Sequence, residues 1–129
     1  MKLKYILIET AGRCVMENKF IQQMKKGVLD MIVLNIIRKK HTYGYELIQK
    51  LEREGEGFFD LKEGTLYPVL YRLEDSGFIR ASWHTEEGRT APKKYYEITE
   101  EGRTVLEEYR KIWGNFKICV DRLCGEVSK

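Results

Sequence analysis

The segment from Glu63 to Glu74 predicts a short helix whose start is fixed by a proline. Its apolar side chains recur at three- and four-residue spacing and so share one helical face: Leu66, Val69, Leu70 and Leu73. Proline lacks an N–H and clashes with the carbonyl four residues back, so Pro68 is expected in the first turn, with the helix starting no earlier than about residues 62–65. The opposite face carries Thr65, Tyr67, Tyr71 and Arg72. A short helix of this kind suits insertion into a DNA groove.

Length and composition predict one globular domain. The chain has 129 residues, of which 43% are hydrophobic and 33% charged, so it is too short for two ordinary domains and too apolar for disorder. Its net charge is only +3, and residues 41–98 hold more acidic than basic side chains. Nucleic-acid binding would therefore need local basic clusters rather than a basic body.

The cysteines, histidines and apolar runs exclude several classes of protein. Three cysteines without C-x-x-C spacing and two distant histidines argue against a disulfide framework or a zinc site, and no cofactor is predicted. No apolar run is long enough to cross a bilayer or to act as an export signal. We therefore expect a cytoplasmic protein with no membrane partner.

Residues 1–15 form an N-terminal extension whose role the sequence does not assign. A four-residue apolar run, Tyr5 to Ile8, is bounded by charged side chains, and the residues that follow Met16 are typical of a protein start. One hypothesis is that Met16 is the natural initiator. The alternative is that residues 1–15 are a strand or arm that packs on the domain, and the mass of the native N-terminus separates the two.

Two helices are predicted before the segment that contains Pro68. A wide apolar stripe indicates a first helix that ends in Arg38-Lys39-Lys40: Phe20, Met24, Leu29, Ile32, Val33, Ile36 and Ile37. Thr42 is expected to cap a second helix over residues 43–54, which two nearby glycines end.

Two strands are predicted after the third helix, which stops near Gly77. Residues 78–84 and 93–98 have strand-like patterns and flank a polar turn region, and Tyr95 and Tyr96 fall on opposite faces. Three helices followed by a β-hairpin give a mainly α fold with a β-hairpin wing, the order of a winged helix-turn-helix domain, assigned to residues 16–98.

Residues 99–129 predict a long helix with an apolar seam. Thr99 is expected to cap it, with Glu100 and Glu101 in its first turn. Apolar residues then follow a heptad pattern: Leu106, Tyr109, Trp113, Phe116, Val120 and Leu123. A partner helix from a second subunit would cover this seam and give a two-fold dimer. The alternative is that the seam folds back on the first helix of the same chain.

Several motifs resemble those of the PadR family of transcriptional regulators, over roughly residues 16–124. They are Tyr43-Gly44-Tyr45-Glu46-Leu47, Glu63-Gly64-Thr65-Leu66-Tyr67-Pro68-Val69-Leu70, Arg72-Leu73-Glu74, Gly77-Phe78-Ile79, Gly88-Arg89, and Lys94-Tyr95-Tyr96-Glu97-Ile98-Thr99-Glu100-Glu101-Gly102. The resemblance implies a cytoplasmic dimeric repressor whose C-terminal helix dimerises and whose wing touches the DNA backbone. The chain is similar to the small subfamily with a single C-terminal helix, and residues 1–15 have no counterpart in it.

The candidate DNA contacts come from the third helix and the wing: Lys62, Thr65, Tyr67, Tyr71, Arg72, Arg89, Lys93 and Lys94. The alternative is that the two tyrosines are half-buried core residues and that the wing cations are a solvated turn. Trp113 and Phe116 are candidates for dimer core and for an effector site between two subunits.

These features favour a sequence-specific DNA-binding repressor that binds an inverted-repeat operator as a homodimer. A small aromatic or apolar effector could release it. The alternative is a winged-helix protein–protein interaction module without specific DNA binding. An enzyme is not expected, because no nucleophile–base pair, paired carboxylates or phosphate loop stands at meaningful spacing.

Overall fold

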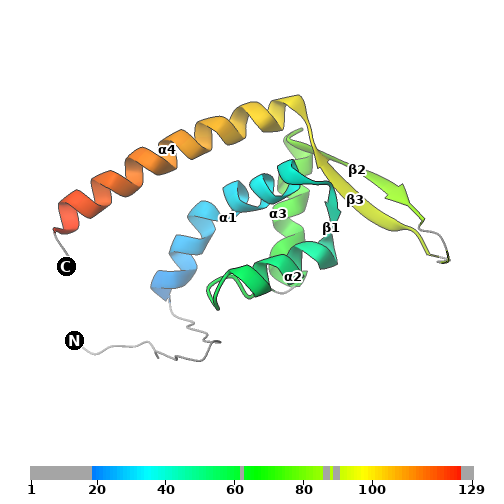
Figure 1. The fold of residues 1–129 in the computed structure, drawn as a ribbon, viewed down its shortest axis with the longest axis horizontal. Coiled ribbons are helices and arrows are strands. Elements are labelled where there is room, and N and C mark those ends of the chain that lie inside the picture. The colour runs from blue at the N-terminus through cyan, green and yellow to red at the C-terminus, as the bar shows by residue number, and fades with distance from the viewer. Residues whose placement is uncertain (1–18, 62, 86–87, 89–90, 126–129) are drawn as a thin grey trace.

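A computed structural model describes residues 19–61, 63–85, 88 and 91–125 of the chain. Its elements follow the predicted order, with one short strand added (Figure 1). They are α1 (Lys19–Lys39), β1 (Thr42–Tyr43), α2 (Gly44–Glu54), α3 (Glu63–Asp75), β2 (Ile79–His84), β3 (Lys93–Ile98) and α4 (Glu100–Cys124). The mainly helical fold with a β-hairpin wing and a long C-terminal helix is thus confirmed. The predicted extension, residues 1–15, lies outside the described residues.

The core lies where α1, α2 and α3 meet the sheet. Leu66, Val69, Leu70 and Leu73 are all buried, which confirms the predicted apolar face of α3. Val33, Leu34 and Ile37 of α1 and Leu47 of α2 pack with them. Burial of these side chains positions α3 with its other face toward solvent.

Pro68 lies deeper in α3 than predicted. The helix starts at Glu63, inside the predicted interval, but Pro68 is five residues further on and beyond the first turn. The prediction that this proline must stand in the first turn was wrong. Proline in a helix removes one backbone hydrogen bond and crowds the carbonyl four residues back. The helix nevertheless continues, and its apolar residues on both sides of Pro68, from Leu66 to Leu73, are buried in the core.

The start of α2 also differs from the prediction. Thr42 belongs to β1, opposite Tyr96 of β3, and the N-cap residue is Tyr43, which makes no side-chain capping bond. The Thr42 hydroxyl instead donates to Oε1 of Glu46 at 2.5 Å. That hydrogen bond, with a smaller attraction from Lys40, holds the pKa of Glu46 below its ordinary value against the opposing effect of burial. Thr42 therefore supports the first turn of α2 through Glu46 rather than as its cap.

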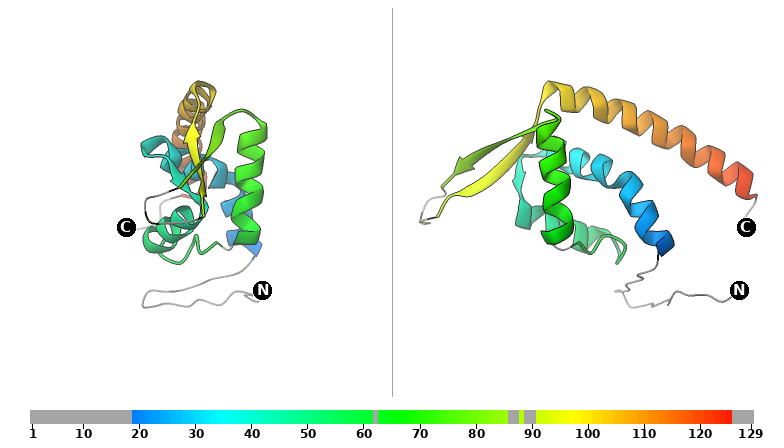
Figure 2. Two further views of the ribbon diagram at one scale, coloured as in Figure 1. Left: turned by 90° about the vertical axis from the view of Figure 1, so that its right-hand side faces the viewer. Right: turned by 180° about the vertical axis from the view of Figure 1, so that it is seen from behind.

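The sheet has three antiparallel strands in the order β1-β3-β2. Ile79 stands opposite Ile98 at the inner end of the hairpin, and His84 stands opposite Lys93 at its outer end. Tyr96 is buried and Tyr95 is half-buried, which fits their predicted placement on opposite faces. The hairpin projects beyond the helical body as a wing (Figures 1 and 2).

The junction between the wing and α4 is tightly packed. Thr99 caps α4, as predicted: its hydroxyl accepts from the backbone N–H of Gly102 at 3.0 Å and donates to the carbonyl of Gly77 at 2.6 Å. Gly102 is buried, and a Cβ there would overlap the backbone oxygen of Phe78. The start of α4 is thereby fixed against the segment that joins α3 to β2.

Candidate nucleic-acid interface

The solvent face of α3 carries the side chains expected to meet DNA. Thr65 is exposed within the first turn, and the side chains of Tyr67 and Tyr71 are 42% and 69% exposed. Lys62 lies outside the described residues. Because N-terminal residues of a recognition helix lie nearest to the groove, Thr65 is the described side chain best placed to reach base edges.

Tyr67 links α3 to the start of α2. Its phenol ring occupies the space in which a Cβ at Gly44 would stand, and Gly44 is buried. A glycine at the centre of the Tyr43-Gly44-Tyr45 motif lets the ring approach the backbone this closely. Tyr67 is therefore partly a packing residue, whereas Tyr71 contributes most of its surface to solvent.

Arg72 is held by an acidic neighbour. Its Nη2 lies 2.6 Å from Oδ1 of Asp30, so the ion pair ties α3 to α1 at the surface. The Arg72 side chain keeps 57% of its area exposed. If Arg72 contacts a DNA phosphate, its guanidinium would therefore exchange the Asp30 carboxylate for the phosphate.

The two lysines at the start of β3 lie on opposite faces of the wing. Lys93 places its Nζ 4.1 Å from the centre of the Tyr43 ring, on the side of β1. Lys94 points to α3, with its Nζ 3.8 Å from Oε1 of Glu74. Arg89 lies outside the described residues. Only one of the two lysines thus shares a face with α3.

Trp83 was not among the predicted contacts. It stands opposite Lys94, and its side chain is 64% exposed, although Ile79 on the same face of β2 is buried. The alternation of the strand places Trp83 on the inward face. The sequence does not reveal that the core ends two residues earlier, which leaves this ring in solvent.

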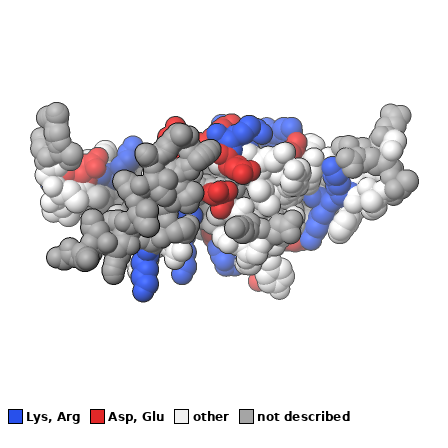
Figure 3. Space-filling model, turned by 90° about the horizontal axis from the view of Figure 1, so that it is seen from below, with Lys and Arg blue, Asp and Glu red and all other residues white. Residues whose placement is uncertain are grey.

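On the face of the molecule that Figure 3 shows, basic side chains are scattered rather than gathered in one field. In the view of Figure 3 they surround a central acidic group, with a basic strip toward the wing. On the outer face of the wing, Nε of Arg80 lies 3.0 Å from Oε2 of Glu97. That hydrogen bond lowers the pKa of Glu97.

Among the described residues, the body of the chain covers the seam of α4 only at its start. Leu106 is buried and Tyr109 packs against the core. Trp113 is 39% exposed, Phe116 59%, Val120 38% and Leu123 81%. The C-terminal half of α4 extends away from the helical body (Figures 1 and 2). Folding back on α1, the alternative weighed from sequence, thus accounts for only the first part of the seam.

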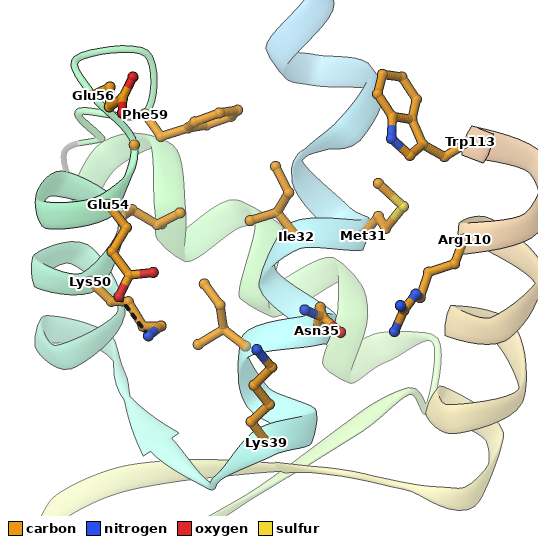
Figure 4. Close-up of a pocket in the computed structure, with 13 residues that line it drawn as sticks. Met31, Ile32, Asn35, Lys39, Lys50, Glu54, Glu56, Phe59, Arg110 and Trp113 are labelled. Atoms are coloured by element: carbon orange, nitrogen blue, oxygen red, sulfur yellow. Dashed lines mark hydrogen bonds and ion pairs between the residues drawn. The ribbon is translucent and has the colours of Figure 1, made fainter. Parts of the chain in front are cut away.

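A cleft of about 600 Å³ opens between α1, α2 and α4. Met31, Ile32, Phe59 and Trp113 form apolar parts of its wall (Figure 4). Its polar lining consists of the Lys50–Glu54 ion pair, at 2.9 Å, the cations Lys39 and Arg110, the carboxylate Glu56 and the amide Asn35. Phe116 is not among the lining residues.

None of the helices in the described part of the chain combines the length and the apolar character that a membrane span needs.

Three helices followed by a hairpin wing, with the exposed face of the third helix beside that wing, define a winged helix-turn-helix protein of the DNA-binding class. The chain belongs to the transcriptional regulator PadR-like family, whose sequence model matches residues 33–108. This confirms the resemblance found in the motifs.

The sequence relatives include a named PadR regulator. An uncharacterised protein of Lysinibacillus sphaericus is 38% identical over 96 residues, which cover 74% of this chain and 87% of the relative. The negative transcriptional regulator PadR of Bacillus subtilis is 32% identical over 82 residues, or 64% of this chain and 44% of that protein. The chain thus spans less than half the length of the Bacillus regulator.

Solved structures of the family are also similar. A PadR-like transcriptional regulator from Bacillus cereus has a TM-score of 0.71 and 38% identity, covering 81% of this chain and 99% of the other. A PadR family transcriptional regulator from Eggerthella lenta has a TM-score of 0.72 and 33% identity, covering 84% and 91%. The protein is accordingly a DNA-binding transcriptional regulator and not an enzyme, and the alternative of an interaction module without DNA binding is not supported.

Proposed function

We propose that this protein is a repressor that binds an inverted-repeat operator as a homodimer in the cytoplasm. The observation that carries the proposal is the exposed apolar stripe on the C-terminal half of α4, formed by Trp113, Phe116, Val120 and Leu123. Winged domains that each read a few bases gain affinity when a two-fold axis pairs them. Repression, rather than activation, is supported by the Bacillus subtilis relative, which is a negative transcriptional regulator.

The DNA contacts that we propose divide into two groups. On α3, Thr65, Tyr67, Tyr71 and Arg72, together with Lys62, face the major groove. On the wing, Lys93, Lys94 and Arg89 contact phosphates. Lys62 and Arg89 rest on the sequence alone, because both lie outside the described residues.

The exposed apolar surface of the stripe supports the dimer. Large aromatic and aliphatic side chains in a continuous row are rare on the surface of a monomer. Their heptad spacing matches the seam of paired helices, in which such residues interdigitate with an identical set. A two-fold pair through α4 would bury the row and fix the distance between two wings.

Replacing Thr65 by Ala tests a contact with DNA bases, and replacing Lys94 by Ala tests a contact with the DNA backbone. Loss of Thr65 is expected to weaken operator binding by about 1–3 kcal/mol with little effect on a scrambled duplex. Loss of Lys94 should lower the affinity for both duplexes by the same factor. It should also reduce the slope of log affinity against log salt concentration by about one unit, the value for one phosphate contact. Fluorescence anisotropy with DNA from upstream of the protein's own gene, at two salt concentrations, measures both. Unchanged salt dependence in the Lys94 variant would show that the wing assignment is wrong.

We also propose that a small aromatic or apolar effector binds next to Trp113 and releases the operator. The sequence placed this site between Trp113 and Phe116 of two subunits. The cleft beside Trp113 supports an effector on one side of α4, because its apolar wall suits an aromatic ring and its cations Lys39, Lys50 and Arg110 outnumber its carboxylates Glu54 and Glu56.

A fluorescent aromatic anion, anilinonaphthalene sulfonate, tests the effector site. It should bind next to Trp113, quench the tryptophan emission and weaken operator binding. Replacing Ile32 by Trp, which fills the cleft, should abolish all three effects. Equal dye binding by the filled variant would rule out the cleft as the effector site.

A further inference from the structure

The face of the wing that turns toward α3 continues past the end of the core. Residues directly opposite one another in an antiparallel pair share a face. On this face the pairs are Ile79 with Ile98, Ala81 with Tyr96, and Trp83 with Lys94. The Ile79–Ile98 pair is buried, as is Tyr96, whereas 64% of the Trp83 side chain is exposed.

Lys94 shows which element this face meets. Its ammonium lies 3.8 Å from the carboxylate of Glu74 on α3, and its own side chain is 37% exposed. Trp83 is therefore directly across the strand from a cation that reaches α3. The opposite face of the wing carries Tyr95, whose ring meets His41, Tyr43 and His84 edge-on. The two faces thus differ in chemistry, and the one with Trp83 turns to the recognition helix.

An exposed indole beside a lysine fits the edge of a DNA groove. Deoxyribose rings present apolar C–H surface, and phosphate oxygens next to them accept hydrogen bonds. Trp offers a large flat apolar body and one N–H donor, so a single side chain can meet both. The wing projects beyond the helical body, where a duplex seated on α3 would run past it (Figure 2).

We propose that Trp83 lies against the sugars of the DNA backbone and donates its Nε1–H to a phosphate oxygen. The contact rests on the proposed binding mode of α3 and the wing. It is independent of base sequence, because sugars and phosphates are the same at every step. Together with Lys94, Trp83 sets how deeply α3 enters the major groove.

Affinity for two duplexes tests the contact. One duplex of about 30 base pairs comes from upstream of the protein's own gene, and the other is its scrambled version, since two half-sites a helical turn apart fit this length. Trp83→Ala should weaken both by the same factor, about tenfold, as expected for a buried aromatic anchor. The slope of affinity against salt should not change, because no charge is lost. Trp83→Phe keeps an aromatic ring, so its affinity for both duplexes should fall much less.

Fluorine NMR gives a readout that does not depend on a variant. The full chain labelled with 5-fluorotryptophan has two signals, from Trp83 and Trp113, and Trp83→Phe assigns them. Either duplex should shift the Trp83 signal. A Trp83 signal that stays in place while anisotropy reports binding would overturn the proposal, and so would full affinity of Trp83→Ala. Wild-type protein that binds neither duplex would instead refute the proposed binding mode, and with it this contact.

Discussion

Replacing Trp113 and Phe116 together by Ala is expected to turn the proposed dimer into a monomer that no longer binds its operator. Both side chains lie in the middle of the α4 stripe, and both are substantially exposed in one chain. Truncating a buried aromatic typically costs about 3–5 kcal/mol, and a two-fold interface loses each contact twice. The winged domain should stay folded, because its core lies elsewhere.

Light scattering and anisotropy on the same sample measure this result, and α4 supplies a matched control. Ile118 is 54% exposed, similar to Phe116, but lies on the side of the helix away from the seam. Ile118→Ala should remain dimeric and bind normally. The proposed mechanism is wrong if the double variant stays dimeric, or if a monomer binds the operator as tightly as the wild type does.

Replacing Gly102 by Ala is expected to have the largest effect on stability. The new methyl group would overlap the carbonyl oxygen of Phe78, and that oxygen already accepts from the backbone N–H of Thr99 at 3.0 Å. Backbone cannot move aside as a flexible side chain can. Overpacking a filled site of this kind costs about 3 kcal/mol. The loss should appear in urea denaturation at fixed protein concentration, since a dimer's stability depends on concentration.

Gly114 provides the control for this substitution. It lies in the same helix, and a Cβ there would meet nothing within 4 Å. Gly114→Ala should be neutral or stabilise the protein by up to about 1 kcal/mol, because alanine favours a helix more than glycine does. If both variants lose the same stability, the close approach of the Phe78 carbonyl is not the reason that position 102 needs glycine.

The sequence predicted those parts of the fold that periodicity determines. The apolar face of α3, the two wing strands and the cap at Thr99 follow from local spacing and from residue preferences, and the structure has all of them. The seam of α4 was predictable for the same reason. The exposure of its C-terminal part agrees with the favoured interpretation, but the pattern alone does not say at which residue α1 stops covering the helix.

Features that depend on contacts distant in sequence could not be predicted. Thr42 was predicted to cap α2 but lies in β1, where it pairs with β3. A strand of two residues is too short to show an alternating pattern, so the sequence around Thr42 does not indicate this pairing. The Arg72–Asp30 ion pair joins residues 42 positions apart. Trp83 was missed as a contact because strand alternation gives the face of a side chain but not the point at which the core ends.

The stoichiometry of the complex with operator DNA tests the central claim most directly. A duplex from upstream of the protein's own gene, where we propose that an inverted repeat lies, would be titrated with wild-type protein, and the mass of the complex measured by light scattering. Two chains per duplex, with an affinity that falls steeply as salt rises and is weaker for a scrambled duplex, is the predicted result. One chain per duplex, or equal affinity for both sequences, would contradict a two-fold repressor paired through α4.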